Sequence, residues 1–372
     1  MYINVLLMVV LFGSLGLFAQ DVTTQHVWFH DGSVSADWHE TCALYPDRFT
    51  AIITSFYIHR QPTVAALVQG LLSSPSLDRI LIIQNNPNPK AHFSAELLQV
   101  EPELNNDRVF LLKMEENRLI NRFFPFEVIR TDAILSLDDD FMIDFGAPGK
   151  CFELMFSKWK EHPNVLLGPC LRGLKLLTKK ATYHSLQDIK STPTPTPTST
   201  SNPSSYWANP KWEYSGATSD THKLILTGFA WFHRQYLHSF WFMMPKEIRQ
   251  WIEEQQNCED LAMNFLIANH TLQSEGYDNE QGLFVYLEES HGGIRQISTQ
   301  QYRKNTEGQE CQDCSSLSDR SMHTRDRWSC TDRLMEAFGG MPLSNLMHKC
   351  STHLNLSKKV HQPFHCVIVD EY

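Results

Sequence analysis

The stretch ILSLDDD, residues 134–140, decides the fold class of this 372-residue chain. It is an apolar run that ends directly on three aspartates, and similar short apolar runs occupy residues 49–56, 80–83 and 109–112. Stretches with helical periodicity, such as residues 62–72, lie between them. Short apolar strands that alternate with helices are typical of a parallel sheet covered on both faces. We therefore predict an α/β fold with a mixed, mostly parallel sheet flanked by helices.

The three aspartates follow the predicted strand at the carboxyl edge of the sheet, where open α/β sheets bind their ligands. Two carboxylates one residue apart, Asp138 and Asp140, can approach a single hard divalent cation whose other ligands are diphosphate oxygens. This is the physical basis of the D-x-D signature of nucleotide-sugar transferases. A solvated acidic turn is the alternative interpretation.

Two further polar segments could serve such a ligand. Arg118 and Arg122 are four residues apart, so on a helix they share one face, and a guanidinium can stack on a uracil or bind a phosphate oxygen. A solvated basic helix end explains this spacing equally well. Asn257 and Asp260 precede an apolar helical stretch, where they fit an N-cap and an acidic third helical residue. The functional alternative is that this helix start presents Asp260 to a reacting sugar and its acceptor.

The charge balance argues against a nucleic acid as partner. Lys and Arg total 32 against 42 Asp and Glu, a formal net charge of -10, whereas binding to polyphosphate by bulk electrostatics requires a basic surface. With 42% hydrophobic and 20% charged residues, the chain can bury a sizeable core as one large domain or two small ones. The same composition excludes a collagen, a coiled coil and a multi-pass membrane protein.

The amino-terminal residues predict entry into the secretory pathway. Residues 1–19 are apolar and uncharged, so we interpret residues 1–20 as a signal peptide or a signal-anchor that could hold the protein at a membrane. A buried amino-terminal strand or helix is the alternative. The sequons at Asn269 and Asn355 and the nine cysteines agree with an oxidising compartment, the ER or Golgi lumen. Within this set, Cys311 and Cys314 form a CxxC pair, as a local disulfide or as two thiols.

Composition also divides the chain along its length. Residues 21–47 resemble a short stem, and residues 346–372 form a carboxyl-terminal tail. A low-complexity Pro/Thr/Ser stretch at residues 191–205 reads as an inserted surface loop, and residues 307–321 form a second polar interruption. The remainder, residues 48–345, is the predicted catalytic domain.

Four motifs in this domain resemble one known family. They are ENR-x-x-NRF at residues 116–123, LSLDDD at 135–140, NCEDLAMNFL at 257–266 and RWSC-x-x-R-x-x-E-x-FGGMPL at 327–343. In this order they resemble the catalytic domain of the exostosin and exostosin-like glycosyltransferases, which are retaining enzymes with a GT-A (nucleotide-diphospho-sugar transferase) fold. The resemblance runs from about Arg48 to about Leu343.

The resemblance implies a site for Mn²⁺, or another divalent cation, and for a UDP-sugar donor. Asp138 and Asp140 would bracket the metal, and Cys258 would pair with Cys330. The implied donor-binding residues are Arg60, Asn85 or Asn86, Asn117, Arg122, Asp138 and Asp139. The implied catalytic residues beside the transferred sugar and the diphosphate are Asn257, Asp260 and Arg327.

The function expected from the resemblance is metal-dependent, retaining transfer of a sugar, first of all N-acetylhexosamine, to a glycan or glycolipid acceptor. Two alternatives are another donor in the same fold, GDP-mannose or UDP-glucuronate, and a catalytically silent subunit of a glycosyltransferase complex. Retention requires either same-face attack as UDP leaves, which we favour, or a covalent intermediate, for which Asp260 is the candidate nucleophile.

Overall fold

The structure is a computed structural model that describes residues 26–27, 45–88, 90, 93, 108–143, 148–177, 212–215, 221–275, 294–296 and 323–343. The predictions for the signal segment, the Pro/Thr/Ser stretch, the CxxC pair, Asn355 and the carboxyl-terminal tail fall outside these residues. So does most of the predicted stem. Within the described residues, no helix has both the length and the apolar character that a membrane span requires.

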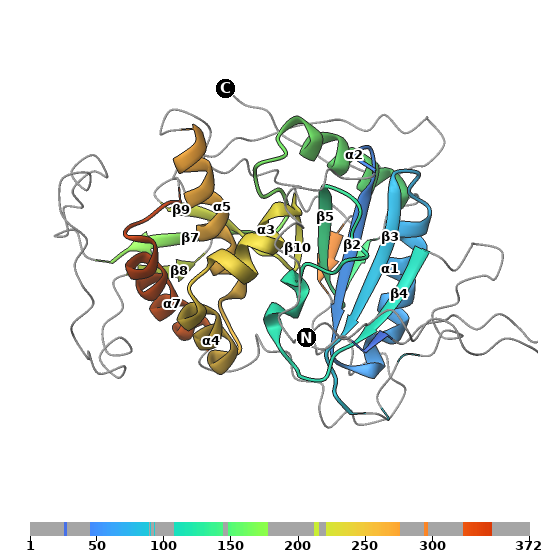
Figure 1. The fold of residues 1–372 in the computed structure, drawn as a ribbon, viewed down its shortest axis with the longest axis horizontal. Helices are drawn as coiled ribbons and strands as arrows, with labels where there is room; N and C mark the ends of the chain where they lie inside the picture. Colours follow the sequence, from blue (N-terminus) through green and yellow to red (C-terminus); the bar gives the residue numbers. More distant parts are fainter. Residues whose placement is uncertain are drawn as a thin grey trace, which may run out of the picture.

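A six-stranded sheet organises the domain (Figure 1). Its strand order is β1 (His26–Val27), β4 (Val109–Lys113), β3 (Leu77–Gln84), β2 (Phe49–Ser55), β5 (Ala133–Asp138) and β10 (Phe229–His233). The first five strands run parallel to their neighbours, and β10 is antiparallel to β5. The predicted α/β fold with a mostly parallel sheet is therefore confirmed.

The central strands are buried on both faces, which is why their sequences are nearly continuous apolar runs. Along β2, Phe49, Ala51 and Ile53 pack into a core shared with α1 (Gln61–Leu72) and α2 (Pro148–Glu161). Ile52, which points to the other face, belongs to the core beneath the remaining helices. This alternation follows from the two-residue period of a strand.

The opposite face belongs to a second core with another set of helices, all but η5 from the carboxyl-terminal half of the chain. They are the 3₁₀ helix η5 (Leu119–Phe123), α3 (Gln235–His238), the π-helical turn η8 (Ser239–Met243), α4 (Lys246–Gln255), α5 (Glu259–Glu275) and α7 (His323–Phe338). A three-stranded antiparallel sheet, β8 (Trp212–Ser215), β7 (Leu171–Leu176) and β9 (His222–Ile225), lies beside α5 and α7 on the side of the molecule away from α1 (Figure 1). A two-stranded sheet pairs β6 (Phe141–Ile143) with β11 (Ile294–Gln296), and a 3₁₀ turn, η2 (Ile58–Arg60), leads into α1.

The strand register brings polar residues to one edge of the main sheet. Thr54 of β2 pairs with Asp138 of β5, and Ser55 pairs with Gln84 of β3. Because β10 runs antiparallel, its start lies at this same edge, where Gly228 O accepts a 2.7 Å hydrogen bond from Asp138 N. The carboxyl ends of β3, β2 and β5 and the beginning of β10 therefore lie along the edge of the sheet that carries Asp138.

Candidate active site

Asp138 ends β5 with its side chain only partly covered. Its Oδ1 lies 2.6 Å from Nη2 of the buried Arg122, and about a third of the side chain, 32%, remains exposed. A Cβ added to Gly228 would lie 2.2 Å from Oδ2 of Asp138, so the carboxylate occupies space that any other residue at position 228 would fill. The Asp138 carboxylate thus lies between the Arg122 guanidinium, which pairs with one oxygen, and Gly228, which leaves room for the other.

Asp139 and Asp140 form the turn between β5 and β6, and both are buried. Asp139 accepts hydrogen bonds from Ser55 Oγ at 2.6 Å and from Arg60 Nη1 at 2.5 Å. The same Arg60 nitrogen lies 3.4 Å from Asp140 Oδ2. Burial raises the pKa of Asp139, and the Arg60 charge opposes that rise. The structure therefore places Arg60 between two of the three aspartates.

The donor set at this turn suits a hard divalent cation. Asp138 and Asp140 offer carboxylate oxygens, the ligands that such ions prefer. The described part of the chain contains no group of three or more His, Cys, Asp or Glu side chains that could hold a metal ion. A cation bound to these two carboxylates would take its remaining ligands from water or from a diphosphate, which is usual for ions of this kind. Asp138 and Asp140 therefore fit a divalent cation that takes its other ligands from water or a diphosphate.

Two predicted donor-binding asparagines make hydrogen bonds to neighbouring loops. Asn85, which follows β3, donates to Arg118 O at 3.0 Å and accepts from Asn121 Nδ2 at 2.8 Å. Asn86 donates to Phe56 O at 3.2 Å. Asn121 is completely buried and was missed by the sequence analysis, although it lies inside the ENR-x-x-NRF motif.

Arg118 and Arg122 do not share one face of a helix, although their spacing would allow it. The helix η5 is a five-residue 3₁₀ helix that begins after Arg118, whose backbone is extended. Arg118 consequently pairs with Glu116 and lies 3.8 Å from Glu253, whereas Arg122 turns to Asp138. Asn117 is exposed in the loop before η5.

The corner between α4 and α5 carries the second group of predicted residues. Gln256 and Cys258 have φ angles of 50° and 77°, a left-handed conformation that is rare for residues other than glycine and clusters at functional sites. Asn257, between them, accepts a hydrogen bond from Cys258 N at 2.9 Å. Because α5 begins at Glu259, it starts one residue later than an N-cap at Asn257 predicts.

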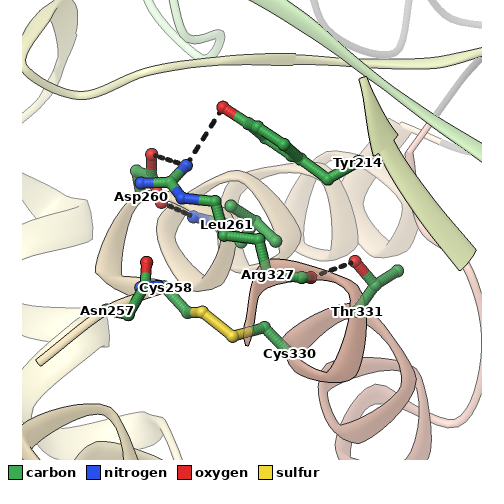
Figure 2. Close-up of a disulfide and its surroundings, with 8 residues drawn as sticks. All are labelled: Tyr214, Asn257, Cys258, Asp260, Leu261, Arg327, Cys330 and Thr331. Carbon is green, nitrogen blue, oxygen red and sulfur yellow. Dashed lines mark hydrogen bonds and ion pairs between the residues drawn. A yellow bond between two sulfur atoms is a disulfide. The ribbon is translucent and has the colours of Figure 1, made fainter. Parts of the chain in front are cut away.

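Asp260, in the first turn of α5, binds Arg327 of α7 (Figure 2). The ion pair measures 2.7 Å, and the second carboxylate oxygen accepts the Leu261 N–H at 2.8 Å. The Arg327 guanidinium also donates to the Tyr214 hydroxyl at 3.2 Å and lies over that ring. Burial would lower the pKa of Arg327, but the charges of Asp260, Tyr214 and Glu259 outweigh it and raise that pKa.

The predicted disulfide between Cys258 and Cys330 is present (Figure 2). The two Cα atoms are 6.2 Å apart and the residues are 72 positions apart in the chain. The bond joins the residue just before α5 to α7, one helical turn from Arg327. It therefore holds together the two elements that supply the Asp260–Arg327 pair.

Glu259 interacts electrostatically with both arginines of the two ion pairs, and the sequence does not single it out. It is 8% exposed, and burial together with the charge of Asp260 raises its pKa to about 7, against the opposing effect of Arg122 and Arg327. Because Glu259 interacts with both arginines, the Arg122–Asp138 and Arg327–Asp260 pairs belong to one electrostatic unit. Tyr214 was missed as well, because nothing in the spacing connects β8 to α7.

The fold is that of an α/β domain with an acidic turn at the carboxyl edge of its sheet and two arginine–aspartate pairs. The model of the glycosyl transferase family 64 domain matches residues 49–192 and 200–354. The chain therefore belongs to this family.

The curated relatives include exostosins and exostosin-like proteins. Human exostosin-2 is 25% identical over 301 residues, which are 81% of this chain but 33% of exostosin-2, so this chain spans about a third of that relative. The glycosylinositol phosphorylceramide mannosyl transferase 1 of Arabidopsis thaliana is 27% identical over 78% of this chain and 72% of its own length. A solved mannosyltransferase of Pyrobaculum calidifontis, in complex with GDP-Man and Mn²⁺, is 14% identical over 63% of this chain and 57% of its own, with a TM-score of 0.34.

Proposed function

We propose that this chain is a metal-dependent retaining glycosyltransferase that moves a sugar from a UDP-sugar to a glycan or glycolipid acceptor. The observation that carries the proposal is the pairing of a partly exposed aspartate at the sheet edge with Arg122, next to a second buried pair, Asp260–Arg327. A donor diphosphate and its sugar need such neighbouring cationic and acidic groups.

Asp138 and Asp140 would hold the divalent cation, which neutralises charge on a leaving diphosphate when it is bound. Arg122 keeps a buried positive charge at this edge of the sheet, and Arg327 supplies a second one near Asp260. Both guanidiniums are held by carboxylates, so their positions are fixed before a donor arrives. Such preorganised charges lower the barrier without a cost of reorganisation.

The contacts of Asp260 favour same-face attack over a covalent intermediate. Each of its oxygens already accepts a hydrogen bond, from Leu261 N and from Arg327. A nucleophilic carboxylate has to direct an oxygen to the anomeric carbon. A carboxylate held at both oxygens is better suited to stabilise developing positive charge on the sugar, while the leaving phosphate accepts the acceptor proton.

N-acetylhexosamine is our first candidate for the transferred sugar, and a mannosyl donor is the second. The second candidate is supported by the Arabidopsis relative, of which this chain covers 72% and whose name is that of a mannosyl transferase acting on a phosphorylceramide. UDP-glucuronate is a further alternative. A silent subunit is disfavoured because Asp138, Asp140, Asp260 and Arg327 are all present.

We further propose that the protein works in the ER or Golgi lumen, either anchored by residues 1–19 or released after cleavage of a signal peptide. This rests on the apolar amino terminus and the sequons, together with the disulfide, a bond typical of oxidising compartments.

Isothermal titration of UDP and of GDP, each with and without Mn²⁺, tests the proposal. We expect Mn²⁺-dependent binding of UDP. A screen for hydrolysis of UDP-GlcNAc, UDP-GalNAc, UDP-glucuronate and GDP-mannose then identifies the donor. Preferred binding of GDP would select the mannosyl alternative, and binding of neither nucleotide would overturn the proposal.

A further inference from the structure

The carboxyl-terminal end of α4 holds the backbone of a loop that leads into the donor site. We call residues 116–122 the bridging segment. Glu253 Oε1 accepts a hydrogen bond from Ile120 N at 3.3 Å, and Gln256 Nε2 lies 3.4 Å from Asn117 O. The Glu253 carboxylate also lies 3.8 Å from Arg118 Nε. The carboxyl-terminal end of α4 thus contacts the bridging segment at Asn117, Arg118 and Ile120.

The opposite side of the bridging segment is tied to the edge of the main sheet. Asn121 donates to Asn85 Oδ1 at 2.8 Å and to Glu116 O at 3.1 Å. The next residue, Arg122, reaches Asp138. The bridging segment therefore spans from α4 to the acidic turn, and its position decides where the Arg122 guanidinium lies.

The same glutamate also fixes the corner that leads to Asp260. The Glu253 carbonyl accepts hydrogen bonds from Gln256 N at 3.3 Å and from Gln256 Nε2 at 3.0 Å. These bonds accompany the left-handed conformation of Gln256, from which the chain turns into α5. Glu253 consequently contacts the bridging segment with its side chain and the α4–α5 corner with its backbone.

We infer that Glu253 is a positioning residue of the donor site, which sets the bridging segment, and with it Arg122, against the corner that carries Asp260. The inference rests on the proposed function. The side chain of Glu253 is 18% exposed and contacts Arg118 and the Ile120 N–H. Glu253 therefore affects the donor site through these groups and not by direct contact with the donor.

The charge of Glu253 is part of this role. The charged groups that face it are Arg118 and Glu116 of the bridging segment and Glu259 at the start of α5. Burial raises the pKa of Glu253 to about 7, the Ile120 N–H and Arg118 oppose the rise, and the two other glutamates add to it. The ionised carboxylate is the stronger acceptor for the Ile120 N–H and also pairs with Arg118, so its contacts with the bridging segment weaken as the pH falls below about 7.

The test compares Glu253→Gln with Glu254→Gln, the same change at the exposed neighbouring position. The affinity for UDP with Mn²⁺ is measured at pH 6 and at pH 8, together with kcat and KM for the donor. We expect wild type and Glu254→Gln to bind UDP more tightly at pH 8 than Glu253→Gln does, by about threefold to tenfold. At pH 6 the three proteins should differ little. Ionisation of UDP affects all three alike, so the difference between variants is the decisive quantity.

A second variant keeps the test independent of any folding defect in α4. Arg118→Gln removes the cation that stabilises the ionised Glu253, so the pH at which UDP affinity declines should move upward. An unchanged decline, or wild-type affinity of Glu253→Gln at pH 8, overturns the inference and leaves the proposed function intact. Failure of wild type to bind UDP at all would instead contradict the proposed function.

Discussion

Gly228 leaves room at the position where the Asp138 carboxylate lies. Its backbone carbonyl accepts the Asp138 N–H, and a methyl group on its Cα would lie 2.2 Å from Asp138 Oδ2. Non-bonded carbon and oxygen atoms do not approach so closely, so any side chain must displace either the carboxylate or the start of β10. Glycine at this position is therefore a requirement of the site's geometry.

Gly228→Ala should weaken Mn²⁺-dependent UDP binding by about tenfold and lower the stability of the fold by about 1–3 kcal/mol, the usual range for overpacking. Titration calorimetry and urea unfolding measure the two effects. In an Asp138→Asn background the added loss of binding should be much smaller, because the displaced group is already altered. Additive losses would show that Gly228 acts on something other than Asp138.

For Asp139 and Asp140, the sequence predicts the place in the fold but not the direction of the side chains. Three consecutive aspartates after a buried strand correctly indicate an acidic turn at the sheet edge. The direction of each side chain is decided by partners that are distant in the chain, Ser55 and Arg60, and these cannot be identified from the spacing. The roles of these residues toward a donor stay predictions.

At the scale of single elements, the first turn of α5 buries two adjacent acids, Glu259 and Asp260. The pKa of Glu259 is raised from 4.5 to about 7, so the folded protein keeps this proton over a range in which the unfolded chain loses it. The stability that the protonated form contributes is complete below pH 4.5 and is lost as the pH rises through about 7.

Glu259→Gln should therefore leave stability almost unchanged near pH 4.5 and raise it relative to wild type at pH 8, by on the order of 2 kcal/mol. Urea unfolding of both proteins across this range measures the difference, with Glu254→Gln as the exposed control. A Glu259→Gln protein that is less stable than wild type at pH 8 would show that the ionised carboxylate is favourable in the fold.

The disulfide joins α5 to α7 across 72 positions of the chain, and closing such a loop stabilises a fold by about 4 kcal/mol in chain-entropy estimates. Replacing Cys258 and Cys330 by Ser should reduce transferase activity more than UDP affinity, because Asp138 is anchored on strand β5 and not on the two helices that the bond joins. Cys170→Ser is the control outside this bond.

Peptide mapping of non-reduced protein should recover the Cys258–Cys330 pair. Recovery of either cysteine bound to Cys311 or Cys314 would contradict the proposed arrangement of the site.

The elements themselves differ in how far the sequence could predict them. The sequence predicts the central strands because burial on both faces leaves short apolar runs, residues 51–53 in β2 and 80–83 in β3. A spacing of four residues cannot distinguish an α-helix from a short 3₁₀ turn, so the sequence alone does not show that Arg118 lies outside η5. Here the buried Asn121 side chain hydrogen-bonds Glu116 O and Asn85, and these contacts accompany the extended conformation before the turn.

At the scale of the whole molecule, the two N-glycosylation sequons differ in where they lie. Asn269 lies within α5, and the Thr271 hydroxyl of its sequon is buried and donates to Ile267 O at 3.0 Å. A glycosylating enzyme would need this segment extended, before α5 forms. Asn355 lies outside the described residues.

In cells that pass the protein through the ER, Asn355→Gln should abolish the mobility shift produced by glycosidase treatment, whereas Asn269→Gln should retain it. Gel electrophoresis of both variants, before and after treatment, gives the answer. An unglycosylated cytosolic protein that keeps residues 1–19 would contradict the proposed secretory location.

The central claim is that Asp138 and Asp140 bind a divalent cation together with a nucleoside diphosphate. Its most direct test is the affinity for UDP, with and without Mn²⁺, of wild type, Asp138→Asn, Asp140→Asn and the exposed control Asp47→Asn. Each substitution at the acidic turn keeps the side-chain volume and removes one charge. We predict Mn²⁺-dependent binding that is retained in Asp47→Asn and weakened at least tenfold, or about 1.4 kcal/mol, in each of the other two while the fold survives. Unchanged Mn²⁺-dependent UDP affinity in Asp140→Asn would contradict the metal assignment.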